Sequence, residues 1–229
     1  MTMSAAIVRL MGKLRTHPRT CIQHPSLGRI VNYVGGYVWA RVGAGIKGEM
    51  DLLLDFDEWL RLLFATGWHG NAESIISLYA DDDAHAVKMH FQLFDDFVVG
   101  SSTAEARDRI PLRRSIRGST EHWPRHNLSD LLRELRKSPA MYVGQRSLIR
   151  VMAFIRGFIA AQSEMGLIEG QTMRADLDAW VRKRFSMHAE HDAESVITFH
   201  SMEDHRALPA FWTLYDEFLE QRTAPQSTN

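Results

Sequence analysis

The chain has 229 residues, of which 45% are hydrophobic and 24% charged, and its formal net charge at pH 7 is −1. This composition is typical of a folded globular protein, and the near-zero charge disfavours nucleic acid or an anionic membrane as the main partner. The single cysteine, Cys21, cannot form an internal disulfide, which fits the reducing cytosol. No apolar run approaches the roughly 18 residues of a membrane helix, and Arg9 interrupts the short apolar run near the N-terminus, so we expect a cytoplasmic protein without a membrane segment.

The first predicted elements are two helices separated by a turn. The sequence IVRLMGKLRTHP predicts a short helix that ends before Pro18. Ser26 begins a second helix, in which Gly36 costs about 1 kcal/mol relative to alanine and so indicates the close approach of another helix. Gly43 and Gly45 are expected to end this helix. Its apolar face consists of Leu27, Ile30, Val31, Val34, Tyr37 and Val38.

Further helices are predicted after this pair. Asp55 is expected to cap a third helix, which Trp59 anchors in the core, and Glu58 completes a capping-box-like pair. The segment AESIISLYA, residues 72–80, is ambiguous between a buried helix and a strand, because β-branched residues cluster there. We interpret it as a helix. The last helix carries an apolar face formed by Val87, Phe91, Phe94 and Phe97.

The phrase LFDDFV at residues 93–98 returns as LYDEFL at residues 214–219, 121 positions later. The same shift places Gly36 on Gly157 and AESIIS on AESVIT without a gap. A period this long does not match a solenoid unit, and it indicates two copies of one small domain. We therefore expect an all-α protein made of two tandem copies of a four- to five-helix domain.

The second copy follows the plan of the first. Ser129 is the predicted cap of its first helix, Asp176 caps its third helix, and Trp180 anchors that helix in the core. Pro209 is expected in the first turn of the last helix, where proline is tolerated. The predicted boundaries are 1–99 for the first copy, 100–127 for a linker, 128–222 for the second copy and 223–229 for a disordered tail.

The linker is the segment that most favours nucleic acid. Its arginines outnumber its acids and leave a net charge of about +3, although few aromatic residues are available for stacking on bases. We interpret it as a solvated segment or an intramolecular clamp, with nucleic-acid binding as an alternative. The arginines are Arg107, Arg109, Arg113, Arg114, Arg117 and Arg125.

No group of residues predicts a catalytic site. The sequence GAGIKG has the glycine spacing of a dinucleotide-binding turn, but it follows a helix instead of a strand. Cys21 could be a nucleophile beside a histidine, but its counterpart in the second copy is Tyr142. Asp55 and Asp57 could be a pair of catalytic carboxylates, but residues two positions apart do not face each other on a helix. The second copy also holds histidines that could share a metal, although the first copy has none in register. They are His188, His191, His200 and His205, beside Asp192. We expect no catalytic residue, no metal and no cofactor.

Acidic residues gather at the predicted bend before the last helix of each copy. Acids near a helix N-terminus interact favourably with the helix dipole, which is one interpretation of these residues. The other interpretation is an acidic surface that binds a basic partner. The residues are Asp81, Asp82 and Asp83 in the first copy, and Glu203 and Asp204 in the second.

Several motifs of the second copy carry a family resemblance. A helix ends in proline, a Met-Tyr-hydrophobic-Gly turn follows, and Ser-Leu opens a helix with an internal Gly-aromatic pair. A Trp-bearing helix and a closing helix with a hydrophobic-aromatic-Asp-Glu-Phe phrase complete the pattern. The residues are Pro139, Met141, Tyr142, Gly144, Ser147, Leu148, Gly157, Phe158, Trp180, Asp216, Glu217 and Phe218. In these features the second copy resembles immunity proteins of bacterial polymorphic toxin systems. The first copy does so more loosely, because RTCIQHP replaces AMYVGQR at the turn.

The resemblance implies a protein that is not an enzyme and that covers the active site of a cognate toxin. The surface of that active site is expected to be basic. The expected contact residues are Trp68, His69, Asn71, Asp81, Asp82, Asp83, Glu203 and Asp204. One alternative is a regulatory protein that acts on nucleic acid through the linker, and another is an enzyme whose site is assembled between the copies. The patterns determine neither the packing of the two copies nor the oligomeric state.

Overall fold

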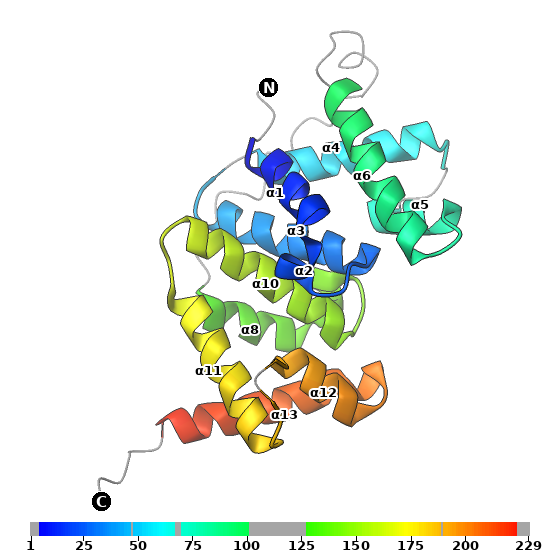
Figure 1. The fold of residues 1–229 in the computed structure, drawn as a ribbon. Helices are drawn as coiled ribbons and strands as arrows, with labels where there is room; N and C mark the ends of the chain where they lie inside the picture. Colours follow the sequence, from blue (N-terminus) through cyan, green and yellow to red (C-terminus); the bar gives the residue numbers. More distant parts are fainter. Residues whose placement is uncertain (1–4, 47, 67–69, 101–126, 189, 224–229) are drawn as a thin grey trace, which may run out of the picture.

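The computed structural model describes residues 5–46, 48–66, 70–100, 127–188 and 190–223. Within these ranges the regular structure is entirely helical, which confirms the prediction of an all-α protein (Figure 1). The N-terminal half contains α1 (Ala5–Thr16), α2 (Pro18–Ile22), α3 (Leu27–Gly43), α4 (Glu49–Leu63), α5 (Ala72–Tyr79) and α6 (Asp83–Gly100). The C-terminal half contains α8 (Leu128–Lys137), α9 (Pro139–Val143), α10 (Leu148–Glu164), α11 (Glu169–Arg184), α12 (Ala193–Ser201) and α13 (Asp204–Thr223).

The described part of each half therefore has six helices, where four or five were predicted. The difference arises because the expected turns after the first helix of each half are the short helices α2 and α9. Each begins with a proline, Pro18 or Pro139, whose fixed φ suits the first helical position and whose missing N–H leaves no donor unsatisfied there. The ambiguous segments are helices α5 and α12, as predicted.

The boundaries of the predicted linker and tail fall largely outside the described residues. Of the linker 100–127, residues 101–126 are not described, while Gly100 ends α6 and Asn127 caps α8. In the tail 223–229, Thr223 still belongs to α13 and the residues after it are not described.

Serine caps begin the central helix of each half, as predicted. The Ser26 side chain accepts a hydrogen bond from the Arg29 N–H at 3.2 Å, and Ser147 accepts from the Arg150 N–H at 3.5 Å. The glycines expected to end the helix of the N-terminal half also do so, since Gly43 is the last residue of α3 and Gly45 follows with a φ value of 85°; in the C-terminal half Gly166 follows α10 with a φ value of 81°. These positive values require little strain only for glycine.

Other predicted caps are wrong. The cap of α8 is Asn127, whose side chain accepts from the Asp130 N–H, so Ser129 lies inside the helix. Asp55 and Asp176 also lie inside helices, because α4 and α11 begin earlier, at Glu49 and Glu169.

Pro209 lies in the second turn of α13 instead of its first, because this helix begins at Asp204.

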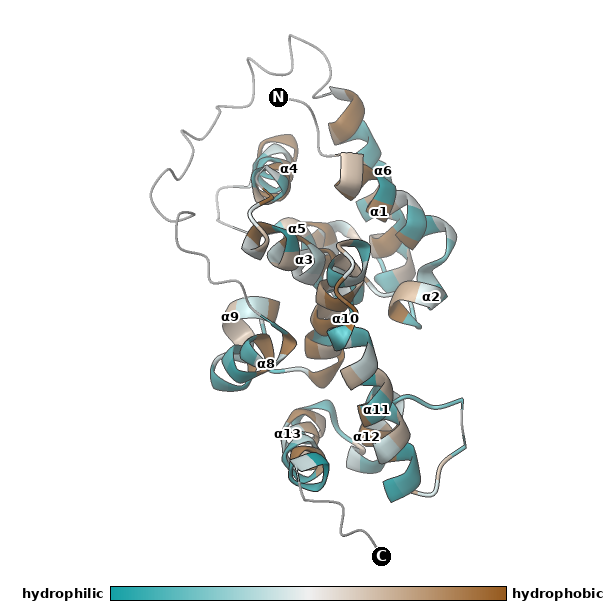
Figure 2. Cartoon of the chain, turned by 90° about the vertical axis from the view of Figure 1, so that its left-hand side faces the viewer, coloured by the Kyte–Doolittle hydropathy of each residue, from teal (hydrophilic) through white to brown (hydrophobic). Residues whose placement is uncertain are grey.

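Helices α3 and α10 pack against each other at the centre of the molecule, and the remaining helices surround this pair (Figure 1). Figure 2 shows hydrophobic residues concentrated along α10. Helix α2 of the N-terminal half also contacts α10 of the C-terminal half. The buried side chains of both halves belong to one continuous hydrophobic cluster, so the two halves share a core.

Two glycines allow the central helices to approach this closely. A Cβ atom at Gly36 would lie 1.9 Å from the carbonyl oxygen of Phe154, and one at Gly157 would lie 1.9 Å from the carbonyl oxygen of Tyr33. Neither space can hold a side chain. The predicted close approach at Gly36 is thereby confirmed, and its partner is the other half of the chain.

None of the helices in the described ranges combines the length and the apolar character that crossing a bilayer requires.

Candidate functional site

Two of the three acids in the bend between α5 and α6 accept hydrogen bonds from the backbone at the start of a helix. The Asp82 side chain accepts a hydrogen bond from the His85 N–H at 2.7 Å and so satisfies a donor at the start of α6. Asp83 accepts from the Leu27 N–H at 3.0 Å and ties the start of α3 to α6. Asp81 is 92% exposed, and its side chain lies 3.0 Å from the His85 ring. Of the three, Asp81 is therefore the residue most available to a partner.

The bend between α12 and α13 exposes apolar as well as acidic side chains. Met202 ends α12 in the left-handed region, with φ 58°, and is 91% exposed, while Phe199 is 72% exposed. Glu203 lies 3.2 Å from His205 and 3.4 Å from Arg206, which are themselves exposed. Asp204 is the first residue of α13, where a carboxylate interacts favourably with the helix dipole.

The α5–α6 bend has the same mixed character. Leu78 and Tyr79 are exposed at the end of α5, and Ala80 separates them from Asp81. Both bends lie toward the right-hand side of Figure 1. Exposed aromatic residues and methionine are enriched at surfaces that bind another protein, and apolar patches rimmed by polar residues mark such surfaces.

The remaining predicted contact residues behave differently. Asn71 caps α5, with its side-chain oxygen accepting from the Ser74 N–H at 3.0 Å. Trp68 and His69 lie outside the described residues.

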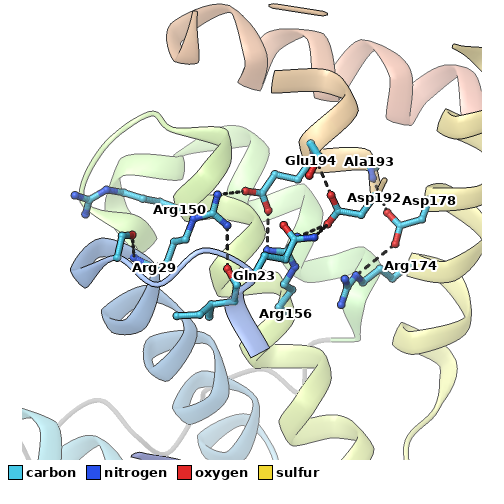
Figure 3. Close-up of polar contacts among 12 residues, drawn as sticks. Gln23, Arg29, Arg150, Arg156, Arg174, Asp178, Asp192, Ala193 and Glu194 are labelled. Atoms are coloured by element: carbon cyan, nitrogen blue, oxygen red, sulfur yellow. Dashed lines mark hydrogen bonds and ion pairs between the residues drawn. The ribbon is translucent and has the colours of Figure 1, made fainter. Parts of the chain in front are cut away.

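A buried cluster of charges joins the two halves (Figure 3). Arg156 of α10 forms ion pairs with Asp192 and, at 2.7 Å, with Glu194, both at the start of α12. From the N-terminal half, Arg29 lies 2.5 Å from Glu194, and the Gln23 amide donates to Asp192 at 2.7 Å. The cluster therefore fixes the position of α2 and α3 relative to α12.

A second, smaller ion pair also joins the two halves, with its arginine in the C-terminal half and its glutamate in the N-terminal half. Arg150 of α10 pairs through both terminal nitrogens with Glu73 of α5, one of these bonds measuring 2.7 Å. Arg29 and Arg150 are counterparts in the 121-residue register, and so are Glu73 and Glu194. Each half thus supplies an arginine to the glutamate of the other half. The sequence analysis did not predict either ion pair. The 121-residue shift aligns two arginines with each other and two glutamates with each other, and this correspondence was the signal that could have indicated the pairs.

Pairing and burial act in opposite directions on the acids of this cluster. Burial opposes the ionisation of Asp192, but Arg156 and the hydrogen bonds from Ser195 outweigh it and hold the pKa of Asp192 below its ordinary value. Burial raises the pKa of Glu194, against the attraction of Arg156 and Arg29. Because these carboxylates are already paired, the cluster is suited to holding the halves together.

A cavity of about 190 Å³ lies in the N-terminal half, between α3, α4, α5, α6 and α9 of the other half. Most of its lining is apolar, and its polar members include Asn32, Asp57 and His90. The Asp57 side chain accepts from the Ala72 N–H at 2.7 Å and so supports the start of α5. Asp178 does the same for Ala193 in the C-terminal half, at 2.9 Å.

Asp57 and Asp178 each accept a hydrogen bond from the first N–H of the helix that follows their own, so they join consecutive helices in the two halves.

The titratable residues of the cavity have shifted pKa values. Burial raises the pKa of Asp57 to about 6, although the Ala72 N–H and Arg61 act in the other direction. Burial lowers the pKa of His90 to about 4, so this ring is neutral near pH 7. The Nδ1 atom of His90 is buried and has no hydrogen-bond partner among the described residues.

No family model, no curated protein and no solved structure matches this chain.

Other candidate residues are not assembled into a site. In the ranges that the structure describes, no three His, Cys, Asp or Glu residues are arranged to hold a metal ion. His188, His191, His200 and His205 are all exposed. Cys21 is buried beside Tyr33, and burial together with Cys21 raises the pKa of that tyrosine.

The buried His90 makes stability depend on pH. An unfolded histidine gains a proton below pH 6.5, whereas folded His90 does so only below about pH 4, so its contribution to stability is lost as pH falls through this window. The counterpart residue in register is Phe211, which is buried. We expect His90→Phe to become more stable relative to the wild type by about 2 kcal/mol between pH 8 and pH 5. Urea unfolding at both pH values measures this difference, and a difference independent of pH would contradict it.

Proposed function

We propose that this chain is a cytoplasmic immunity protein that binds a cognate bacterial toxin and covers its active site, without catalysis or a cofactor. The family resemblance of the second copy motivates the proposal. The observation that carries it is the pair of exposed bends, at α5–α6 and α12–α13, where large apolar side chains adjoin acids. Such a combination can bury apolar area against a partner while its charges select a basic one.

The two bends suit a toxin whose active site is basic. Asp81 and Glu203 are exposed and are not needed to cap a helix, so they can pair with arginine or lysine on the partner. Complementary charge speeds association and orients the partner, while exposed apolar residues such as Phe199 and Met202 supply the contacts that slow dissociation.

We further propose that the two halves arose by internal duplication. Support comes from the order of the helices, which is the same in both halves, and from α2 and α9, which begin at Pro18 and Pro139 in the 121-residue register. The exchanged contacts Arg29–Glu194 and Arg150–Glu73 have the reciprocity of a two-fold symmetric dimer interface. Under this proposal the two bends are duplicated copies of one surface.

The experiment co-expresses the chain with the toxin encoded by the neighbouring reading frame and measures bacterial growth and the Kd of the complex. Leu78→Ser/Asp81→Lys alters the first bend, and Met202→Asn/Glu203→Lys alters the second. Asparagine tolerates the left-handed backbone at position 202. We expect at least about tenfold weaker binding from the bend that contacts the toxin, the loss typical of an interface hot spot.

A matched control changes another exposed apolar residue and another acid. Leu167→Ser/Asp176→Lys alters neither bend, and it should bind the toxin as the wild type does. If both bend variants bind like this control, the bends are not the interface. If the wild-type chain gives no protection from the toxin, the immunity function itself is wrong.

A further inference from the structure

The cavity of the N-terminal half lies where the C-terminal half holds an arginine side chain. Gly35 and Gly144 line the cavity, and their counterparts in the register of the proposed duplication are Arg156 and Gln23. The longer side chains of Arg156 and Gln23 both contact Asp192, which belongs to the C-terminal half. The two glycines therefore leave open a space into which the Arg156 and Gln23 side chains extend in the other half, where Arg156 and Asp178 still border a cavity of about 380 Å³.

Around the C-terminal space the arginines balance the carboxylates in number, whereas around the N-terminal space one carboxylate is left over. In the C-terminal half, three arginines pair with three carboxylates, namely Arg29, Arg156 and Arg174 with Asp178, Asp192 and Glu194. In the N-terminal half, Arg150 pairs with Glu73, and Asn71 replaces the third carboxylate. Asp57 remains. The Arg61 charge attracts it, but Arg61 pairs with Glu58, and Asp57 forms no ion pair within the described part of the chain.

We propose that this cavity binds a guanidinium group carried on a short aliphatic stem, which takes the place that Arg156 occupies in the other half. The Asp57 carboxylate is the charge partner, and a guanidinium ion donates a charge-assisted hydrogen bond to a carboxylate oxygen. One Asp57 oxygen already accepts from Ala72, which leaves the second oxygen for the ligand.

The rest of the lining suits such a ligand. The Asn32 amide nitrogen donates to the Gly28 carbonyl at 2.7 Å, so its side-chain oxygen is the acceptor left for a ligand. His90 is neutral near pH 7 and does not repel a cation. Val31, Val34 and Phe94 provide apolar contacts for the stem. A volume of about 190 Å³ is sufficient, since a cavity of roughly 150 Å³ accepts benzene.

The ligand can enter beside Asn71 and Gly144, the exposed residues of the lining. The guanidinium group can belong to a free small molecule or to an arginine of the bound toxin. Both sources present the same guanidinium group to the cavity, and the experiment below distinguishes between them.

The experiment titrates the full chain with ethylguanidinium chloride and, in parallel, with ethylurea, a neutral molecule of the same shape. Binding is followed by chemical-shift changes in amide NMR spectra and by calorimetry. We expect saturable binding of ethylguanidinium and at least about tenfold weaker binding of ethylurea, because the carboxylate favours the cation. Equal binding of both compounds, or no saturable binding of either, would overturn the proposal.

Two variants test the location. Asp57→Asn keeps an oxygen for the Ala72 N–H but removes the charge, and it should reduce ethylguanidinium affinity at least about tenfold. Gly35→Arg should abolish binding by placing a guanidinium in the cavity, and a Cβ at this position meets the Phe154 ring at an ordinary 3.6 Å. Asp176→Asn is the control and should bind as the wild type does. Unchanged binding by folded Asp57→Asn contradicts the proposed site even if Gly35→Arg fails to fold.

The same variants identify the source of the group. If the cavity takes an arginine of the toxin, Gly35→Arg also abolishes protection in the growth assay. If it takes a free molecule, protection remains. Ethylguanidinium binding is measured without the toxin, so its failure is distinguishable from failure of the proposed immunity function.

Discussion

Gly36→Ala is expected to destabilise the protein by about 3 kcal/mol, although alanine is the better helix former. The added Cβ would lie 1.9 Å from the Phe154 carbonyl oxygen, which belongs to the backbone of α10. A backbone atom cannot rotate away as a side chain can, so α3 and α10 must separate along the contact that both halves share. Urea unfolding at pH 7 measures the loss.

The chain supplies a matched control for this substitution. Gly12 lies in α1, and a Cβ there would meet no atom within 4 Å. Gly12→Ala should therefore stabilise the protein by up to about 1 kcal/mol through helix propensity alone. If Gly36→Ala behaves in the same way, the close crossing of α3 and α10 is wrong.

Glu194→Gln is expected to reduce the free energy of unfolding by about 3 kcal/mol. The glutamate side chain is 2% exposed and neutralises both Arg29 and Arg156. Without its charge, the buried Arg29 loses its ion pair and Arg156 keeps only the carboxylate of Asp192. Removing one partner of a buried ion pair leaves an uncompensated charge, and this is the origin of the expected loss.

An exposed ion pair provides the comparison. Glu217 lies 3.6 Å from Arg184, and both side chains are well exposed, so water screens their attraction. Glu217→Gln should change stability by less than about 0.5 kcal/mol. Equal effects of the two substitutions would mean that the buried cluster does not hold the halves together.

The features that follow from near neighbours in sequence were predictable. The serine caps at 26 and 147 are examples, because the cap and the N–H it accepts from lie three residues apart. The cap assigned to Asp55 failed because α4 begins after Gly48. The cap assigned to Ser129 failed because another acceptable cap stands two residues before it. Asp, Asn and Ser are all acceptable caps, and where several occur close together the residue that leaves the helical conformation is decided by packing. At α8 that residue is Asn127.

Of the candidate contact residues, the sequence located the acidic bends but not the role of each acid. Asp82 and Asp83 hold helix ends, while Asp81 is exposed. The exposed apolar residues of the bends were also missed. Hydrophobic periodicity assigns residues such as Phe199 and Met202 to no particular surface, and their exposure depends on where α12 ends against α13.

The sequence by itself determined the helical class, the order of the helices and the need for small residues at Gly36, because helical periodicity and glycine placement are local properties of the chain. Only the tertiary structure decided that Gly36 meets α10, that Arg29 reaches Glu194, and that Gly35 borders a cavity. These contacts join residues distant in sequence, and they depend on the angle and depth at which two helices cross. That geometry is set by the packing of the whole core.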